Sequence, residues 1–305
     1  MGLKSLISVF LLLPFHQVMG AACCGGGASL PTLITGDYRG QAVLSGSNAA
    51  ITHDSNANGS INKRNGNNQE IIEVLTLSTS YLVSPYWQIG MTLPYKFNTH
   101  KTRSYMESSR GLSDIKAQLA YEFLPEYSFS LWRPRGYIFL EQTFPNSRST
   151  YDADKPLRSD SLGNGFYTTA LGLSFVKTIY SFDLLFMSEV HKGLKRKFKQ
   201  NSESFSVTPN LGGSGLLGIG YSPYNGNFRI GGTLLYSKEG SREITGNTST
   251  TSNPSYFWEA GVNVSYLLND ISFSIAYRDQ SFLGEASNTT LSKSVNASII
   301  KFFEL

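Results

Sequence analysis

The sequence predicts an all-β fold, a transmembrane up-and-down antiparallel β-barrel of about 12 strands. Three observations support this prediction. From Leu33 onward, short segments of alternating apolar and polar residues are joined by connections that are alternately short and long. Charged residues make up only 16% of the chain and aromatic residues 13%, which suits a wall with a lipid-facing band and aromatic girdles. The chain also begins with an export signal.

The connections fall into two classes. Short ones occupy 83–86, 177–180, 222–226 and 268–270, whereas long polar tracts occupy 48–69, 98–111, 146–165, 193–204 and 237–254. Outer-membrane barrels have short periplasmic turns and longer extracellular loops. We therefore expect the long tracts on the outside of a Gram-negative outer membrane.

Twelve strands can be placed between these connections, and each is long enough for the 9–11 residues that a tilted strand needs to cross a bilayer. Their expected spans are 34–47, 70–84, 86–98, 112–124, 135–145, 165–178, 180–191, 205–221, 226–238, 255–268, 270–282 and 291–304. Two places fit less well. The connection 124–134 is the longest on the turn side, and Pro209 with Gly212 and Gly213 interrupts the eighth span.

Alternation is clearest in the third span, where Trp87, Ile89 and Met91 share one face and Gln88 and Thr92 share the other. A soluble β-sandwich could alternate in the same way. The export signal, the strand lengths and the aromatic residues near strand ends favour a membrane barrel. An even number of strands returns both ends of the chain to the side of the short turns.

The N-terminus carries the export signal. Lys4 precedes the apolar run 6–15, so we expect 1–20 to be a signal peptide, 21–33 a periplasmic segment and 34–305 the outer-membrane barrel. Cleavage before Cys23 would make the chain a lipoprotein, and this alternative stays open. Cys23 and Cys24 could hold a soft metal, join another chain or lie in a flexible end.

At the other end, the strand 291–304 would carry the signal for the barrel-assembly machinery. Such signals usually end in an aromatic residue, whereas this chain ends in Leu305 with Phe303 two residues before it. The formal net charge of +4 is too small to indicate a nucleic-acid partner. No site for a cofactor is evident.

Several short motifs resemble one family. The stretch 85–97 (PYWQIGMTLPYKF), a polar loop and then 110–123 (RGLSDIKAQLAYEF) resemble the meta-pathway phenol-degradation-like outer-membrane proteins. The tracts 139–145 (FLEQTFP), 162–165 (LGNG) and 277–294 add to the resemblance, although Ser113 stands where the family's "GlGD" motif has glycine. The resemblance implies a barrel distantly related to hydrocarbon and fatty-acid channels, which moves small molecules across the outer membrane.

Charged residues on the inner faces of the strands are the candidate functional residues. They could line a hydrated pore and tune its selectivity, or pair across strands and fill a narrow interior. The set consists of Lys96, Asp114, Lys116, Glu122, Glu141, Asp183, Glu189, Arg229, Glu259 and Arg278. Asp114 could tie an extracellular loop to the barrel rim through backbone N–H groups, or contact a ligand.

Other features indicate partners or rival functions. The basic tract 192–199 could bind anionic lipopolysaccharide, steer solutes or simply be solvated. His53, His100 and His191 lie near expected extracellular strand ends, but no serine has a nucleophile-elbow setting and no metal-binding spacing appears. The chain is therefore expected to be no enzyme.

Three functions remain in order. The first is passive passage of small solutes, hydrophobic or aromatic ones among them, through an outer-membrane channel or transporter. The second is a structural or surface-interaction barrel that displays long loops within outer-membrane lipid. The third is a hydrolase with its active site at the barrel rim.

Overall fold

The computed structural model describes residues 31–36, 38–128, 130–200, 203–223 and 226–304. The expected signal peptide 1–20, the Cys23–Cys24 pair and Leu305 lie outside these residues. Within the part of the chain that the structure describes, no helix is long and apolar enough to span a membrane.

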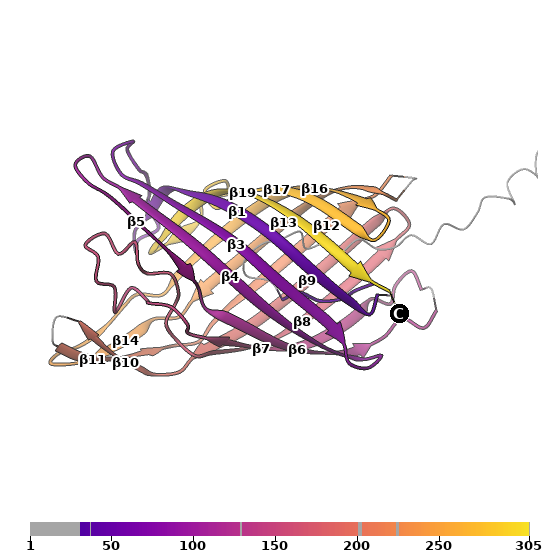
Figure 1. The fold of residues 1–305 in the computed structure, drawn as a ribbon, viewed down its shortest axis with the longest axis horizontal. Helices are drawn as coiled ribbons and strands as arrows, with labels where there is room; N and C mark the ends of the chain where they lie inside the picture. The colour runs from indigo at the N-terminus through magenta and orange to yellow at the C-terminus, as the bar shows by residue number, and fades with distance from the viewer. Residues whose placement is uncertain (1–30, 37, 129, 201–202, 224–225, 305) are drawn as a thin grey trace, which may run out of the picture.

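Twelve long strands form one closed antiparallel barrel (Figure 1). Each strand pairs with its neighbour along the chain, and pairing of the first with the last closes the ring. The strands are β1 (Gly40–Ser55), β3 (Gln69–Leu82), β4 (Trp87–Lys101), β6 (Ile115–Leu124), β7 (Arg135–Phe144), β8 (Thr168–Ile179), β9 (Phe182–Gly193), β12 (Gly212–Tyr221), β13 (Phe228–Glu239), β16 (Ser255–Leu268), β17 (Ile271–Asp279) and β19 (Thr289–Phe303).

The two ends of the barrel differ as the sequence predicts. At the end that holds the C-terminus, here called the turn end, the connections are 83–86, 125–134, 180–181, 222–227 and 269–270. At the opposite end, the loop end, the long connections carry short strands of their own (Figure 1). These are β2 (Ile61–Lys63), β5 (Met106–Leu112), β10 (Arg196–Gln200), β11 (Glu203–Pro209), β14 (Arg242–Thr245), β15 (Ser249–Thr251) and β18 (Ala286–Ser287).

The alternation of faces in β4 is confirmed. Trp87, Ile89 and Met91 are 44–48% exposed on the outer face, whereas Gln88 on the inner face is 1% exposed. An apolar outer face with a buried polar inner face is the pattern of a wall that faces lipid. The long connection between β6 and β7 also lies where it was expected.

The first strand lies further along the chain than its expected span of 34–47. It begins at Gly40, which pairs with Phe303 of β19, and it continues to Ser55. Leu33, Ile34 and Tyr38 alternate with polar residues as a strand does, but they are buried inside the barrel instead. Alternation alone does not distinguish these two positions.

Residues 31–36, here called the N-terminal plug, lie in the lumen at the turn end. Side chains of the wall bind its backbone: Ser80 donates to Thr32 O at 2.5 Å, and Gln88 accepts from Ile34 N at 2.7 Å. Gln41 donates to Leu33 O, and Arg135 donates to Thr35 O at 2.6 Å. These wall side chains supply the hydrogen bonds that a buried extended segment would otherwise lack.

The eighth expected span, 205–221, is not one strand. It divides at Asn210 and Leu211 into β11 and β12, which belong to different sheets. The strands β10, β11, β14 and β15 form a separate four-stranded sheet at the loop end. Pro209 cannot donate to a ladder, which agrees with the end of β11 at this residue.

Candidate functional site: a cavity in the loop-end half of the lumen

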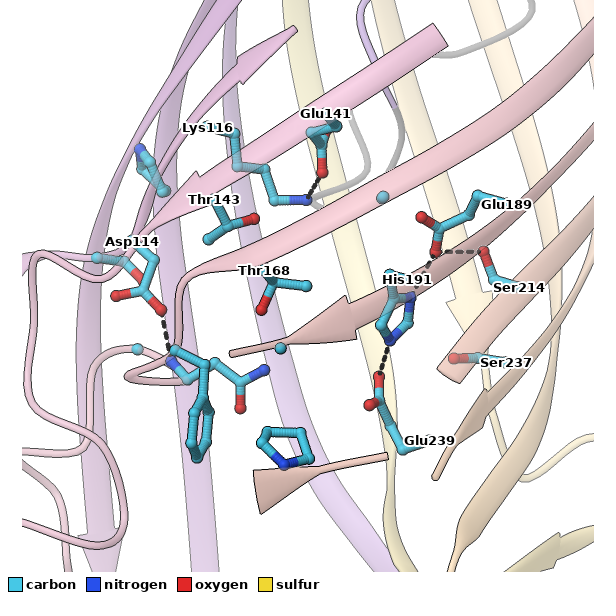
Figure 2. A pocket seen from close by; sticks show the side chains of 18 of the residues that line it. Asp114, Lys116, Glu141, Thr143, Thr168, Glu189, His191, Ser214, Ser237 and Glu239 are labelled. Carbon is cyan, nitrogen blue, oxygen red and sulfur yellow. Dashed lines mark hydrogen bonds and ion pairs between the residues drawn. The ribbon is translucent and has the colours of Figure 1, made fainter. Parts of the chain in front are cut away.

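A cavity of about 630 Å³ occupies the loop-end half of the lumen. Its walls come from the inner faces of β3, β4, β6 to β9, β12, β13 and β16, and Figure 2 shows these side chains converging. Leu162, Gly163 and Asn164 of the 146–165 loop also line it. The cavity is the largest feature of the lumen that can be described here, and we treat it as the candidate site.

An apolar layer, here called the apolar floor, separates the cavity from the N-terminal plug. Leu33 of the plug packs against side chains from the wall, and Leu235 belongs both to this layer and to the cavity lining. The members are Leu33, Ala120, Tyr137, Phe139, Leu185, Met187, Leu216 and Leu235. The lumen is therefore open in its loop-end half and filled in its turn-end half.

Sequence reasoning missed the apolar floor, because apolar side chains were expected to face lipid. The segment 135–144 contains the available signal: Tyr137 and Phe139 face inward, while Ile138 and Leu140 face outward. A strand that is apolar on both faces must bury one face inside the barrel. The same pattern occurs in β9, where Leu185 and Met187 are buried.

Two groups of charged residues are bonded to one another across the cavity wall (Figure 2). Lys116 Nζ and Glu141 Oε1 are 2.7 Å apart on neighbouring strands. His191 lies between two carboxylates, with Nδ1 3.1 Å from Glu189 and Nε2 3.2 Å from Glu239. Both arrangements keep charge in the cavity while satisfying each charged group locally.

Asp114 ties the 146–165 loop to the barrel wall. Its Oδ1 accepts hydrogen bonds from Asn146 N at 3.3 Å and Ser147 Oγ at 3.0 Å. Its Oδ2 accepts from Asn164 N at 2.6 Å and Gly165 N at 3.3 Å. One carboxylate thus joins both ends of the loop, which is the tying role that its sequence position suggested.

Neighbouring residues allow this close approach. A Cβ on Gly163 would lie 2.2 Å from Asp114 Oδ1, so only glycine fits there. Ser113 Oγ donates to Leu162 O at 2.5 Å, and Asn98 donates to Ser161 O at 2.9 Å. The loop is held mainly by polar contacts.

Within the loop, Asp160 organises the chain. Burial raises its pKa, but the N–H groups of Asp154 and Lys155 and the Arg148 guanidinium lower it further, so the net pKa lies below its ordinary value. Asp154 N donates to Asp160 at 2.9 Å. The carboxylate therefore remains charged in the folded loop at neutral pH.

Aromatic side chains cover the loop end of the cavity. Arg242 lies 5.9 Å from the ring centroid of Tyr151 and 5.7 Å from that of Phe166, and it donates to Asn164 Oδ1 at 3.3 Å. Arg242 and Phe166 also line the cavity. The apolar cluster around them consists of Tyr151, Phe166, Phe198, Phe205, Val207 and Ile244.

The expected inner residues divide into two groups. Lys96, Asp114, Lys116, Glu141 and Glu189 line the cavity together. The others form separate ion pairs, among which are Arg229–Asp183 at 2.6 Å and Arg278–Glu259 at 3.6 Å. Glu122 pairs with Arg135 at 2.8 Å, next to the N-terminal plug.

The histidines do not form a hydrolytic site. His53 contacts Thr52 and His100 contacts Glu70, and among the described residues no serine hydroxyl is bonded to a histidine. Ser214 donates to Glu189 rather than to His191. No group of three or more His, Cys, Asp or Glu side chains in the described chain could hold a metal ion.

No family model matches the chain, and no curated protein matches it. Among solved structures, it is similar to the COG4313 outer membrane channel from Pseudomonas putida F1, with a TM-score of 0.69 and 13% identity over 89% of this chain and 100% of that one. The chain has an outer-membrane β-barrel fold. The CymD monoaromatic hydrocarbon channel is more distant, with a TM-score of 0.42 and 14% identity over 88% of this barrel and 90% of that chain.

Proposed function

We propose that the protein is a passive channel of the outer membrane for small solutes, hydrophobic or aromatic ones among them. The observation that carries this proposal is the cavity of about 630 Å³ inside a closed barrel. Sites for small molecules have volumes of about 300–1,000 Å³. A barrel that served only as a wall could fill its whole interior with side chains, as it does in the turn-end half.

Two further observations support a route through the lumen. The N-terminal plug is a short segment of chain that is held by a few wall side chains, so its displacement requires no unfolding of the barrel. The similar barrel from Pseudomonas putida is described as a channel, and the motifs around 85–97 and 110–123 resemble a family of outer-membrane transporters. The solute would cross the floor when the plug moves.

The orientation follows from the proposed location. The signal peptide would export the chain, the turn end would face the periplasm and the loop end would face outward. The exposed lysines of the 192–199 tract then lie where lipopolysaccharide phosphates are found, and β19 would be the strand that the barrel-assembly machinery recognises. We expect no enzymatic activity, since the histidines are engaged as described above.

The test is the conductance of the purified, folded protein in planar bilayers, together with the swelling of proteoliposomes in small solutes. We expect discrete conductance steps and solute entry, neither of which should occur with protein unfolded by heat. A folded barrel that gives neither signal would contradict the channel. It would favour the alternative, a surface-interaction barrel, whose supporting observation is the four-stranded sheet at the loop end.

A further inference from the structure

Lys96 is the cation of the cavity that lacks a direct partner. Lys116 is paired with Glu141, and Arg242 contacts two aromatic rings and the Asn164 side chain. For Lys96, the described residues supply neither a hydrogen bond nor an ion pair within 4 Å, although its side chain is partly buried. A cation removed from water without a counter-ion is costly, so the position is suited to a partner that arrives from outside.

The nearby carboxylates are already engaged. The two whose charges act on Lys96 are Glu70 and Asp114. Glu70 contacts Arg64 at 2.9 Å and His100 at 3.2 Å. Asp114 accepts the four hydrogen bonds that hold the 146–165 loop. Rotation of either carboxylate toward Lys96 would break these contacts.

The wall around Lys96 is apolar. In the ladder between β3 and β4, Lys96 lies directly opposite Val74. Ile72 and Pro94 occupy inward positions on the same two strands and line the same cavity. Leu235 and Phe257 line it from β13 and β16. A ligand bound to Lys96 would therefore place its remaining atoms against hydrocarbon.

The other charges of the cavity limit the charge of that ligand. Glu141, Glu189 and Glu239 also face the cavity, and their carboxylates repel a second negative charge. The only cations offered to a ligand without displacing a carboxylate are Lys96 and Arg242, as far as the described residues show. A singly charged group is favoured over a dianion such as a phosphate monoester.

We propose that the cavity binds small amphipathic monocarboxylates, with the carboxylate on Lys96 Nζ and an aromatic or aliphatic body against Val74, Pro94 and the apolar floor. This inference rests on the proposed channel function, since it names the class of solute. A carboxylate on an ammonium group forms a charge-assisted hydrogen bond, whereas a neutral amide of the same shape does not.

The test compares two probes of equal shape, 3-phenylpropanoate and its neutral amide, 3-phenylpropanamide. Binding to the detergent-solubilised mature protein is measured by calorimetry at pH 7.5, where the acid is ionised. We expect the carboxylate to bind about tenfold more tightly than the amide, the effect of one charged hydrogen bond. Lys96→Met keeps the apolar stem and should abolish this preference, leaving amide binding unchanged.

Two variants serve as controls. Lys197→Met removes an exposed lysine of β10 outside the cavity, and Lys96→Arg keeps the positive charge, so both should retain the preference. Heat-modifiable gel mobility checks folding, and Lys96→Gln replaces Lys96→Met if the latter fails to fold. Equal affinity of wild-type protein for both probes, binding of neither, or a preference that survives in Lys96→Met would overturn the carboxylate site.

The same variants are measured for bilayer conductance, which separates this inference from the channel itself. Conductance without a carboxylate preference would contradict only the site proposed here. A preference that depends on Lys96 in a barrel without conductance or solute entry would contradict the channel and leave the binding site standing.

Discussion

The two halves of the lumen are built from the same strands but have opposite interiors. In the turn-end half, Arg229 and Asp183 form a dry ion pair with side chains only 3% and 9% exposed, and the N-terminal plug fills the remaining space. In the loop-end half, Lys116 and Glu141 form a similar pair that faces an open cavity. The comparison separates two tasks: the turn-end half blocks passage, and the loop-end half can hold a solute.

The N-terminal plug gives the largest test of this comparison. A mature chain shortened to begin at residue 37 lacks the plug and should conduct several-fold better than the full chain, because the lumen at the turn end is widened. Single-channel recording in planar bilayers measures this change. A chain shortened to begin at Pro31 retains all the described contacts of the plug and is the matched control.

Equal conductance of the two shortened chains would break the comparison. The barrier would then lie in the wall side chains of the apolar floor, such as Tyr137 and Phe139, rather than in the chain's own N-terminal segment. Conductance that rises in both shortened chains would place the barrier before residue 31.

The ion pairs give the next test. Arg229 binds Asp183 through two parallel hydrogen bonds of 2.8 and 2.6 Å, and Arg229→Met leaves that carboxylate buried and without its main partner. Breaking a buried pair costs about 3–5 kcal/mol. Lys116→Met leaves Glu141 beside the cavity, where water can solvate it, and should cost about 1 kcal/mol.

Unfolding in urea from lipid vesicles measures both free energies. The comparison is sharpened if Arg229→Met lowers the free energy of unfolding much more than Lys116→Met does. Equal losses would show that the loop-end half of the lumen is as dry as the turn-end half, contrary to the cavity between its walls.

The sequence predicts the wall better than the lumen. Alternation along β4 and the lengths of the connections follow directly from a strand's period of two and from the different demands of the two membrane faces. The loop-end strands β10, β11, β14 and β15 were not predicted, because they lie in polar tracts outside the lipid, where no apolar face marks a strand.

The contents of the lumen depend on which side chains meet across the barrel, and one strand's pattern does not contain that information. Leu33 and Ile34 resemble the start of a strand, yet they fold into the interior. The charged inner residues were identified as a set, but the division between those that line the cavity and the pairs elsewhere, such as Arg229 with Asp183, is set by the cross-strand register.

Asp114 gives the smallest expected effect and tests how the loop-end half is closed. Asp114→Ala removes the hydrogen bonds that hold both ends of the 146–165 loop, while the loop keeps its contacts to Asn98 and Ser113. Loop opening should become easier by about 2 kcal/mol, roughly a thirtyfold larger open population. Trypsin cleavage within the loop should accelerate accordingly, since proteolysis follows the open population.

The control is Asp154→Ala, which alters an exposed carboxylate of the same loop that contacts only Arg148 among the described side chains. It should leave cleavage nearly unchanged, and neither variant should shift the unfolding of the barrel measurably. Equal cleavage of the two variants would mean that the aromatic cluster around Phe166 and Tyr151, rather than Asp114, closes the cavity. The loop-end half would then be sealed by packing, as the turn-end half is, and the contrast between the two halves would lie only in the space that they enclose.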